Sequence, residues 1–171
     1  MKSVMLFTLF LLGTQFSSMA QTEPVTTGGL TWYTDLNKAR ELSDASHKPI
    51  FGFFTGSDWC GWCRKLQSDV FLKKAFVEWA RKNVILLELD FPRRKEQPAE
   101  LVQQNQALQQ AFGVRGYPTV WLFYVTPDST NPQNFSLAAL GSLGYPQGME
   151  VGQEEVKFLS DANAILANGK K

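Results

Sequence analysis

The chain has 171 residues, which is enough for one ordinary domain with a sizeable core but too few for two large domains. Its hydrophobic content of 44% and aromatic content of 13% are typical of a packed globular protein and exclude a disordered or fibrous chain. The 17 Lys and Arg residues are balanced by 16 Asp and Glu residues. This balance provides no basic footprint for nucleic acid or for an anionic membrane surface, so we expect no nucleic-acid partner.

Residues 1–20 have the three parts of a secretory signal peptide. Lys2 supplies a positive charge, residues 4–12 form a short apolar run, and small residues frame position 19. We expect cleavage between Ala20 and Gln21, and therefore a periplasmic or secreted protein. Because the apolar run is about half as long as a segment that spans a bilayer, we expect no stable membrane anchor.

The rest of the chain is predicted to consist of a leader and one folded domain. Residues 21–29 are polar, contain Pro and Gly and lack periodicity, which predicts a flexible leader. The domain is expected to occupy residues 30–171. It is predicted to begin with a helix that is capped by Thr34 or Asp35 and ends before Pro49, followed by a strand at 50–55. A helical stretch at 60–83, interrupted near Val70 and Phe71, and a strand at 84–89 come next. The remaining predicted elements are a helix from about Ala99, a strand at 119–125, a weak strand at 136–140 and a C-terminal helix that contains Phe158 and Leu166.

This order of elements predicts the fold class. Helices that alternate with buried strands indicate an α/β fold in which at least part of the sheet is parallel. Residues 91–100 are charged and contain two prolines, so we expect an exposed loop between a strand and the following helix.

The two cysteines form the sharpest chemical signal in the sequence. They lie three residues apart in Trp59-Cys60-Gly61-Trp62-Cys63, at the junction of a predicted strand and helix. A structural zinc site is disfavoured because it needs four ligands, and the chain offers only these two thiols and one histidine, His47. A purely structural disulfide is a second interpretation, although so short a loop contributes only about 2 kcal/mol.

A redox pair is the interpretation that uses the position of the cysteines best. A thiolate at the start of a helix lies near unpaired N–H groups, which lower its pKa and make it nucleophilic. Cys60 has that position, and Cys63, one turn later and deeper, can attack a mixed disulfide formed at Cys60. We therefore predict Cys60 as the attacking thiol and Cys63 as the resolving thiol. No metal, nucleotide or flavin cofactor is expected, because the cysteines themselves carry the electrons.

Two segments resemble the signatures of the thioredoxin-like family. Residues 59–66 (WCGWCRKL) resemble its active-site motif, and residues 113–119 (GVRGYPT) resemble its second signature, with a cis-proline at Pro118. Both occur in the expected order, and the resemblance extends from Trp32 to the C-terminal helix. It implies an α/β thioredoxin-like fold with a central mixed sheet, helices on both faces, and Pro118 against the cysteine pair.

The resemblance also implies a substrate-binding rim around the reactive sulfur. The backbone of Tyr117 would pair with an extended substrate segment by strand-like hydrogen bonds. Trp59, Gly61, Trp62 and Pro118 would complete this rim, although core packing is an equally good reason for Trp59. The implied partners are protein thiols or disulfides as substrates and a redox partner protein, and we expect a monomer.

The chain departs from the family pattern below the cysteines. The family's usual buried aspartate falls near Gly52, and its lysine partner falls near Leu86, so both charges are missing. Proton transfer to the deeper thiol would then need water, Glu88 or Asp58.

A second departure is the long interval between Cys63 and Pro118. It includes the loop with Arg93, Arg94 and Lys95, which is either a solvated insertion or a docking element for a partner.

Two classes of function remain open at this point. The first is an exported thiol–disulfide oxidoreductase that exchanges disulfides with protein substrates through Cys60 and Cys63. The second is a non-catalytic thioredoxin-like module with a structural disulfide, which binds polypeptides through the Tyr117 edge and the 91–100 loop. The direction of electron flow is also open, although Gly61 and Trp62 provide no histidine to stabilise a thiolate, which argues against a very strong oxidant.

Overall fold

A computed structural model describes residues 23–127 and 135–169 of the chain. The expected signal peptide, residues 1–20, lies outside the described residues. Among the helices that the structure describes, none is long and apolar enough to cross a bilayer.

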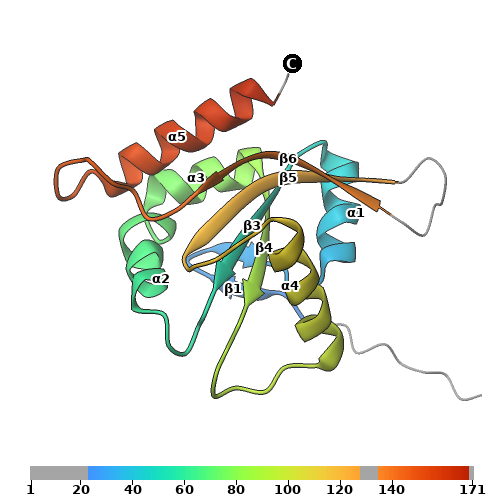
Figure 1. The fold of residues 1–171 in the computed structure, drawn as a ribbon. Coiled ribbons are helices and arrows are strands. Elements are labelled where there is room, and N and C mark those ends of the chain that lie inside the picture. The colour runs from blue at the N-terminus through green and yellow to red at the C-terminus, as the bar shows by residue number, and fades with distance from the viewer. Residues whose placement is uncertain (1–22, 128–134, 170–171) are drawn as a thin grey trace, which may run out of the picture.

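A four-stranded sheet of order β4-β3-β5-β6 forms the centre of the fold (Figure 1). Strand β3 (Ile50–Thr55) runs parallel to β4 (Ile85–Asp90) and antiparallel to β5 (Thr119–Pro127). Strand β5 also pairs antiparallel with β6 (Phe135–Leu143), which is longer than the predicted weak strand at 136–140. The predicted α/β fold with a central mixed sheet is therefore confirmed.

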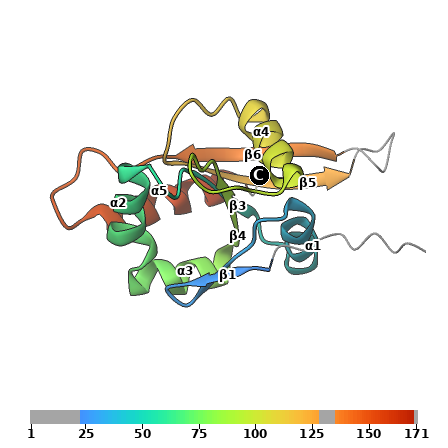
Figure 2. The ribbon, with the colours of Figure 1, turned by 90° about the horizontal axis from the view of Figure 1, so that it is seen from below.

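Helices cover both faces of this sheet, as predicted. Figures 1 and 2 show α2 and α5 on one side and α1 and α4 on the other. The two groups of helices bury separate apolar clusters against the two sides of β3. The first group consists of α2 (Gly61–Leu66), the π-helix η1 (Gln67–Phe71), α3 (Lys74–Asn83) and α5 (Glu154–Asn168), and the second consists of α1 (Leu36–Ser46) and α4 (Ala99–Ala111).

Helix α1 begins and ends where local chemistry predicts. The carboxylate of Asp35, the N-cap residue, accepts the N–H of Asn37 at 2.7 Å. At the other end, His47 adopts a left-handed conformation with φ of 55°, two residues before Pro49. His47 is thus an exposed residue that terminates a helix.

The predicted interruption within 60–83 is the π-helix Gln67–Phe71. Val70 and Phe71, the apolar residues at this point, are buried. The ring of Phe71 stacks on that of Phe76 in α3, with centroids 4.7 Å apart. The change of helix type therefore turns the chain so that α2 and α3 both pack on the same side of the sheet.

The prediction of a flexible leader at 21–29 missed a strand. Val25–Thr27 forms β1, which pairs antiparallel with β2 (Leu30–Trp32). Gly28 and Gly29 connect the two strands with φ of 60° and 76°, a conformation that suits glycine in a two-residue hairpin. Because all residues of β1 are exposed, the strand has no hydrophobic alternation by which to recognise it.

Strand β3 lies at the centre of the core, with all its residues buried. Phe51 and Phe53 face the first group of helices, whereas Ile50 and Phe54 face the second group. Gly52 also faces the second group, because a Cβ there would lie 2.9 Å from a ring carbon of Phe123. The sheet can therefore accept only the smallest residue at this position.

Replacing Gly52 by Ala should lower the free energy of unfolding by about 1–3 kcal/mol, because the added methyl group presses on a packed core. Denaturation in urea measures this change. Gly116→Ala is the matched control, since a Cβ at that position meets nothing within 4 Å. An equal loss of stability in both variants would contradict the explanation.

Candidate active site

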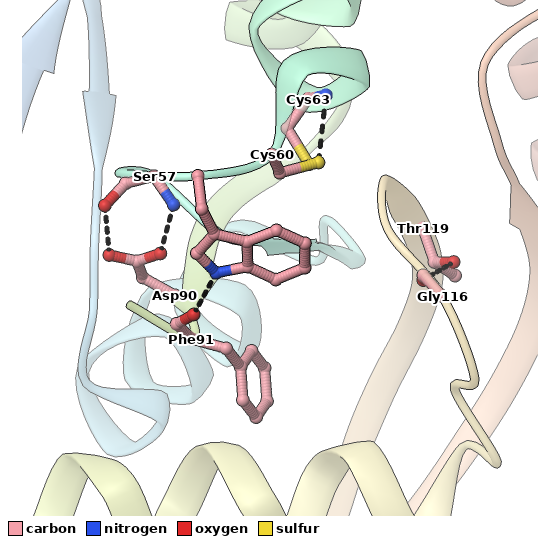
Figure 3. Close-up of a disulfide and its surroundings, with 8 residues drawn as sticks. Ser57, Cys60, Cys63, Asp90, Phe91, Gly116 and Thr119 are labelled. Atoms are coloured by element: carbon pink, nitrogen blue, oxygen red, sulfur yellow. Dashed lines mark hydrogen bonds between the residues drawn. A yellow bond between two sulfur atoms is a disulfide. The ribbon is translucent and has the colours of Figure 1, made fainter. Parts of the chain in front are cut away.

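Cys60 and Cys63 form a disulfide at the start of α2 (Figure 3). Cys60 is the N-cap residue of this helix, and its Sγ accepts the N–H of Cys63 at 3.1 Å. Cys60 is 5% exposed and Cys63 is 1% exposed. The sulfur of Cys63 is thus shielded by the core, while that of Cys60 lies at its edge.

A tight turn carries the chain from β3 to the disulfide. The C=O of Gly56 accepts the N–H of Trp59 at 3.2 Å and that of Cys60 at 2.8 Å. A Cβ on Gly56 would lie 2.4 Å from the Trp59 ring, so only glycine fits. Ser57 donates from its N–H and its hydroxyl to the carboxylate of Asp90 at 2.7 and 2.6 Å (Figure 3). The turn is therefore fixed to the end of β4.

Trp59 connects three segments that are distant in sequence. Its Nε1 donates to the C=O of Phe91 at 2.8 Å. Its ring makes an edge contact with Tyr117 at a centroid distance of 5.7 Å. The guanidinium carbon of Arg93 lies over the same ring, 3.9 Å from its centroid. No sequence pattern indicated this contact with Arg93.

Trp62 lies on the other side of the cysteines and is 58% exposed. It contacts the ring of Tyr145 at a centroid distance of 5.1 Å. The hydroxyl of Tyr145 donates to Asp69 at 2.7 Å, and Lys65 donates to the same carboxylate at 2.7 Å. Lys65, followed by Tyr145, lowers the pKa of Asp69 to about 2. Trp62 is thus exposed but supported by an anchored ring.

The turn before β5 brings Tyr117 and Pro118 to the site. The peptide bond between them is cis. The ring of Tyr117 stacks on Phe91 at 5.2 Å, and its hydroxyl accepts a hydrogen bond from Gln109 at 2.6 Å. Within residues 23–127 and 135–169, the N–H and C=O of Tyr117 have no backbone partner. In Figure 3 the turn with Gly116 and Thr119 lies on the side to which the sulfur atoms point.

Gly61, the remaining predicted site residue, is the first residue of α2. It is exposed, and a Cβ there would have only the end of the Arg64 side chain at 4.0 Å. The structure therefore brings all the predicted site residues to one end of the sheet, around the disulfide.

The β3 residue that faces the disulfide is Phe53, which corrects the placement of the family's aspartate near Gly52. Phe53 lies in the same apolar cluster as the two cysteines, whereas Gly52 faces the opposite side. Leu86, at the expected place of the lysine, also belongs to the cysteine cluster. Both charges are absent, and a phenyl ring occupies the position below the disulfide.

Glu88 is the acidic side chain that lies nearest to this position in the sheet. It pairs in register with Phe53 and shares a face of β4 with Leu86, two residues away. Burial and, second to it, the charge of Asp90 raise the pKa of Glu88 to about 7, while Lys95 acts in the opposite direction. Glu88 can therefore hold or release a proton near neutral pH.

Asp58, the other acidic candidate, binds the loop after β4. Its carboxylate accepts the N–H of Arg93 at 3.1 Å and that of Arg94 at 2.7 Å. Burial raises the pKa of Asp58, but these backbone N–H groups outweigh burial, and the pKa lies below its ordinary value. Asp58 is thus an anchor for the loop and stays ionised.

The positions of the His, Cys, Asp and Glu side chains in the described residues bear on whether a metal ion could bind. No group of three His, Cys, Asp or Glu side chains comes together among them in a way that could bind one. His47, the histidine considered as a ligand, lies at the C-terminal end of α1.

Comparison with known proteins identifies the family. The family model for the thioredoxin-like domain matches residues 36–128. The chain belongs to the thioredoxin-like family. Its resemblance to the family at Cys60 and Cys63, in a WCGWC motif, is therefore confirmed.

Two relatives of this thioredoxin-like protein come from Chlamydia pneumoniae. The chain is 40% identical over 101 residues to a protein named disulfide bond reductase DsbH, which covers 59% of this chain and 60% of the relative. It is 22% identical over 166 residues to thioredoxin-related protein DsbJ, which covers 97% of this chain and 45% of the relative. The chain thus spans less than two thirds of the length of either relative.

Solved structures agree with the thioredoxin-like fold. The structure of DsbH oxidoreductase has a TM-score of 0.65 and 29% sequence identity, over 94% of this chain and 95% of that chain. A thioredoxin from Thermus thermophilus has a TM-score of 0.54 at 15% identity, over 81% and 88% of the two chains, which shows the fold alone.

Replacing Glu88 by Gln should stabilise the thioredoxin-like domain at pH 8 and change its stability little at pH 4. The ordinary pKa of this glutamate is 4.5 and its pKa in the fold is about 7, so between these values the folded protein keeps a proton that the unfolded chain has lost. Stability therefore falls as the pH rises through this window, by about 3 kcal/mol at most.

Urea unfolding of both proteins at pH 4, 6 and 8 measures this effect. The variant has no carboxyl at position 88, so it lacks this loss of stability. Glu100→Gln, a change at an exposed glutamate of α4, is the control. Parallel pH profiles for Glu88→Gln and the unmodified protein would contradict a buried, protonated Glu88.

Proposed function

We propose that the protein is an exported thiol–disulfide oxidoreductase that reduces disulfides in client polypeptides through Cys60 and Cys63. The observation that carries the proposal is the asymmetry of the pair. The N–H of Cys63 points at the sulfur of Cys60, where it would stabilise a thiolate, and Cys63 itself is almost fully buried. The name of the 40% identical relative, a disulfide bond reductase, supports the reductive direction. The pattern of residues 1–20 supports export.

The reaction consists of two exchanges. The Cys60 thiolate attacks one sulfur of a client disulfide, so that a mixed disulfide forms, the client's S–S bond breaks and its second sulfur leaves as a thiolate. Cys63, after losing its proton, attacks Cys60 Sγ, and the client's first sulfur leaves in turn. Two electrons have then passed to the client. A redox partner protein with a dithiol would return the Cys60–Cys63 disulfide to its reduced form.

The rim around the disulfide would orient the client for this attack. The backbone groups of Tyr117, which have no backbone partner in the part of the chain that the structure describes, suit an extended client segment that would add to them as a strand. Pro118 has no N–H to compete for this segment. Trp59 and Trp62 would line its two sides, and the exposed Gly61 would leave the approach to Cys60 open.

The low exposure of Cys60, 5% in the oxidised pair, favours a second candidate function. In that case the disulfide is structural, and the protein is a thioredoxin-like module that binds polypeptides without exchanging electrons. The two functions differ in the reactivity of Cys60, which the following measurements report.

Replacing Cys63 by Ala should trap clients on Cys60 as mixed disulfides, because the thiol that resolves them is gone. The measurement is electrophoresis without reductant after incubation with a disulfide-bonded polypeptide such as insulin. The adduct should disappear on addition of dithiothreitol. Cys60→Ala, the matched control, should form no such adduct, and failure of Cys63→Ala to form one would refute the mechanism.

The reduction potential of the pair should lie roughly between −270 and −120 mV, the range of catalytic thioredoxin-like proteins. Equilibration with glutathione buffers, followed by alkylation of free thiols, measures it. A potential below about −300 mV, together with an unreactive Cys60, would instead identify a structural disulfide.

A further inference from the structure

We propose that Arg93, Arg94 and Arg115 form a basic rim that selects client segments with Asp or Glu beside the cysteine that Cys60 attacks. This inference rests on the proposed function, because it concerns the class of polypeptide that reaches the disulfide. The occupant is a polypeptide, since the neighbouring Tyr117 offers an N–H and a C=O without a backbone partner among the described residues.

The loop that carries two of these arginines is fixed relative to the cysteines. Asp58, two residues before Cys60, accepts the N–H groups of Arg93 and Arg94, the latter at 2.7 Å. The loop also begins at Phe91, whose C=O accepts Trp59 Nε1. The backbone of the loop is therefore tied to the same turn that presents Cys60, which is unexpected for a merely solvated insertion.

The side chain of Arg93 places its charge on the aromatic rim itself. Its guanidinium lies 3.9 Å from the centroid of Trp59, the residue directly before Cys60. Trp59 in turn contacts Tyr117, the residue whose backbone would bind the client. A carboxylate beside the client's cysteine would come close to this guanidinium, which binds carboxylates through a rigid pair of donors.

Arg115 brings positive charge to the same edge from a different segment. It is exposed and stands two residues before Tyr117. The stacking of Phe91 on Tyr117 at 5.2 Å brings this turn and the start of the basic loop side by side. The client would therefore meet arginines from both segments.

These arginines form no ion pair within the described part of the chain. The ion pairs found there all use lysines of helices, so Arg93, Arg94 and Arg115 have no carboxylate within ion-pair distance among those residues. Two neighbouring carboxylates bind other groups, since Asp58 accepts N–H groups of the loop backbone and Asp90 binds Ser57. Glu96, in the same loop, is exposed. Lys95, the next residue in the loop, is also exposed, and its charge acts to lower the pKa of Glu88.

The chain as a whole has a formal net charge of only +1, so attraction of acidic clients would depend on where the arginines stand near Trp59 and Tyr117. Exposed charges contribute little to equilibrium affinity but raise the rate at which an oppositely charged partner associates. The selection should therefore appear in kcat/KM and should weaken as the salt concentration rises.

The experiment compares three disulfide-bonded peptides that differ only in the residues beside the cysteine. These residues are Asp and Glu in the acidic peptide, Ser in the neutral peptide and Lys in the basic peptide. With unmodified protein at low ionic strength, we expect kcat/KM to be about tenfold higher for the acidic than for the basic peptide. Arg94→Glu and Arg115→Glu should each reduce or reverse this ratio. Neither residue has a contact with Trp59 among the described residues, so the rim of aromatic rings is left in place.

Lys82→Glu is the matched control, because Lys82 is an exposed residue near the end of α3 and the change in net charge is the same. It should leave the ratio unchanged. Reduction of hydroxyethyl disulfide, which is neutral, should be the same in all variants and shows that Cys60 remains reactive.

Equal kcat/KM values for the three peptides, or an equal effect of Lys82→Glu and Arg94→Glu, would overturn the basic rim alone. Failure of the unmodified protein to reduce any of the peptides would overturn the proposed function and the rim with it. The two failures are therefore distinguishable.

Discussion

The indole of Trp59 holds together the ends of β3 and β4, and the site depends on this one side chain. It fits against Gly56 so closely that no Cβ is tolerated there, and its Nε1 binds the C=O of Phe91 beyond β4. Because β3 and β4 are parallel, both chains leave the sheet at the same edge. The turn to Cys60 and the loop to Arg93 therefore begin side by side, and Trp59 locks them to each other.

The phenylalanine-rich core surrounds the disulfide, and Cys63 is the less exposed of its two residues. Phe53 and Phe71 pack in the cluster that contains both cysteines, with their rings 5.0 Å apart. An apolar surrounding disfavours a charged thiolate, whereas the edge of the cluster, where Cys60 lies, has the N–H of Cys63 to stabilise one. On the proposed function, the N–H group that points at Cys60 Sγ would favour ionisation of Cys60 over that of Cys63.

Local sequence signals predicted most of the fold but not the contacts that organise the site. The cap at Asp35, the buried strand at 50–55 and the paired signatures are each contained in a few consecutive residues. The anchoring of Arg94 by Asp58 joins residues 36 positions apart. No periodicity encodes such a contact. The position of the family's aspartate was assigned to Gly52 instead of Phe53 because an alignment does not show which face of the strand a residue occupies. Side chains of a strand alternate between the two faces, so an alignment error of one residue places a side chain on the wrong face.

On the proposed function, charged groups nearer the surface would control the reactivity of the two cysteines, because apolar side chains occupy the positions of the family's buried charges. In this chain Phe53 and Leu86 occupy the positions beneath the cysteines, so no ion pair there can take up the proton of Cys63. Glu88, with a pKa of about 7, lies in the neighbouring strand β4 and is mostly buried but not fully, so it can exchange its proton with water. Arg93, on the outer side of Trp59, adds positive charge nearer to Cys60 than to the core. The positive charge of Arg93 near the surface and the apolar side chains of the core both favour ionisation of Cys60 before Cys63. A reductase requires this order.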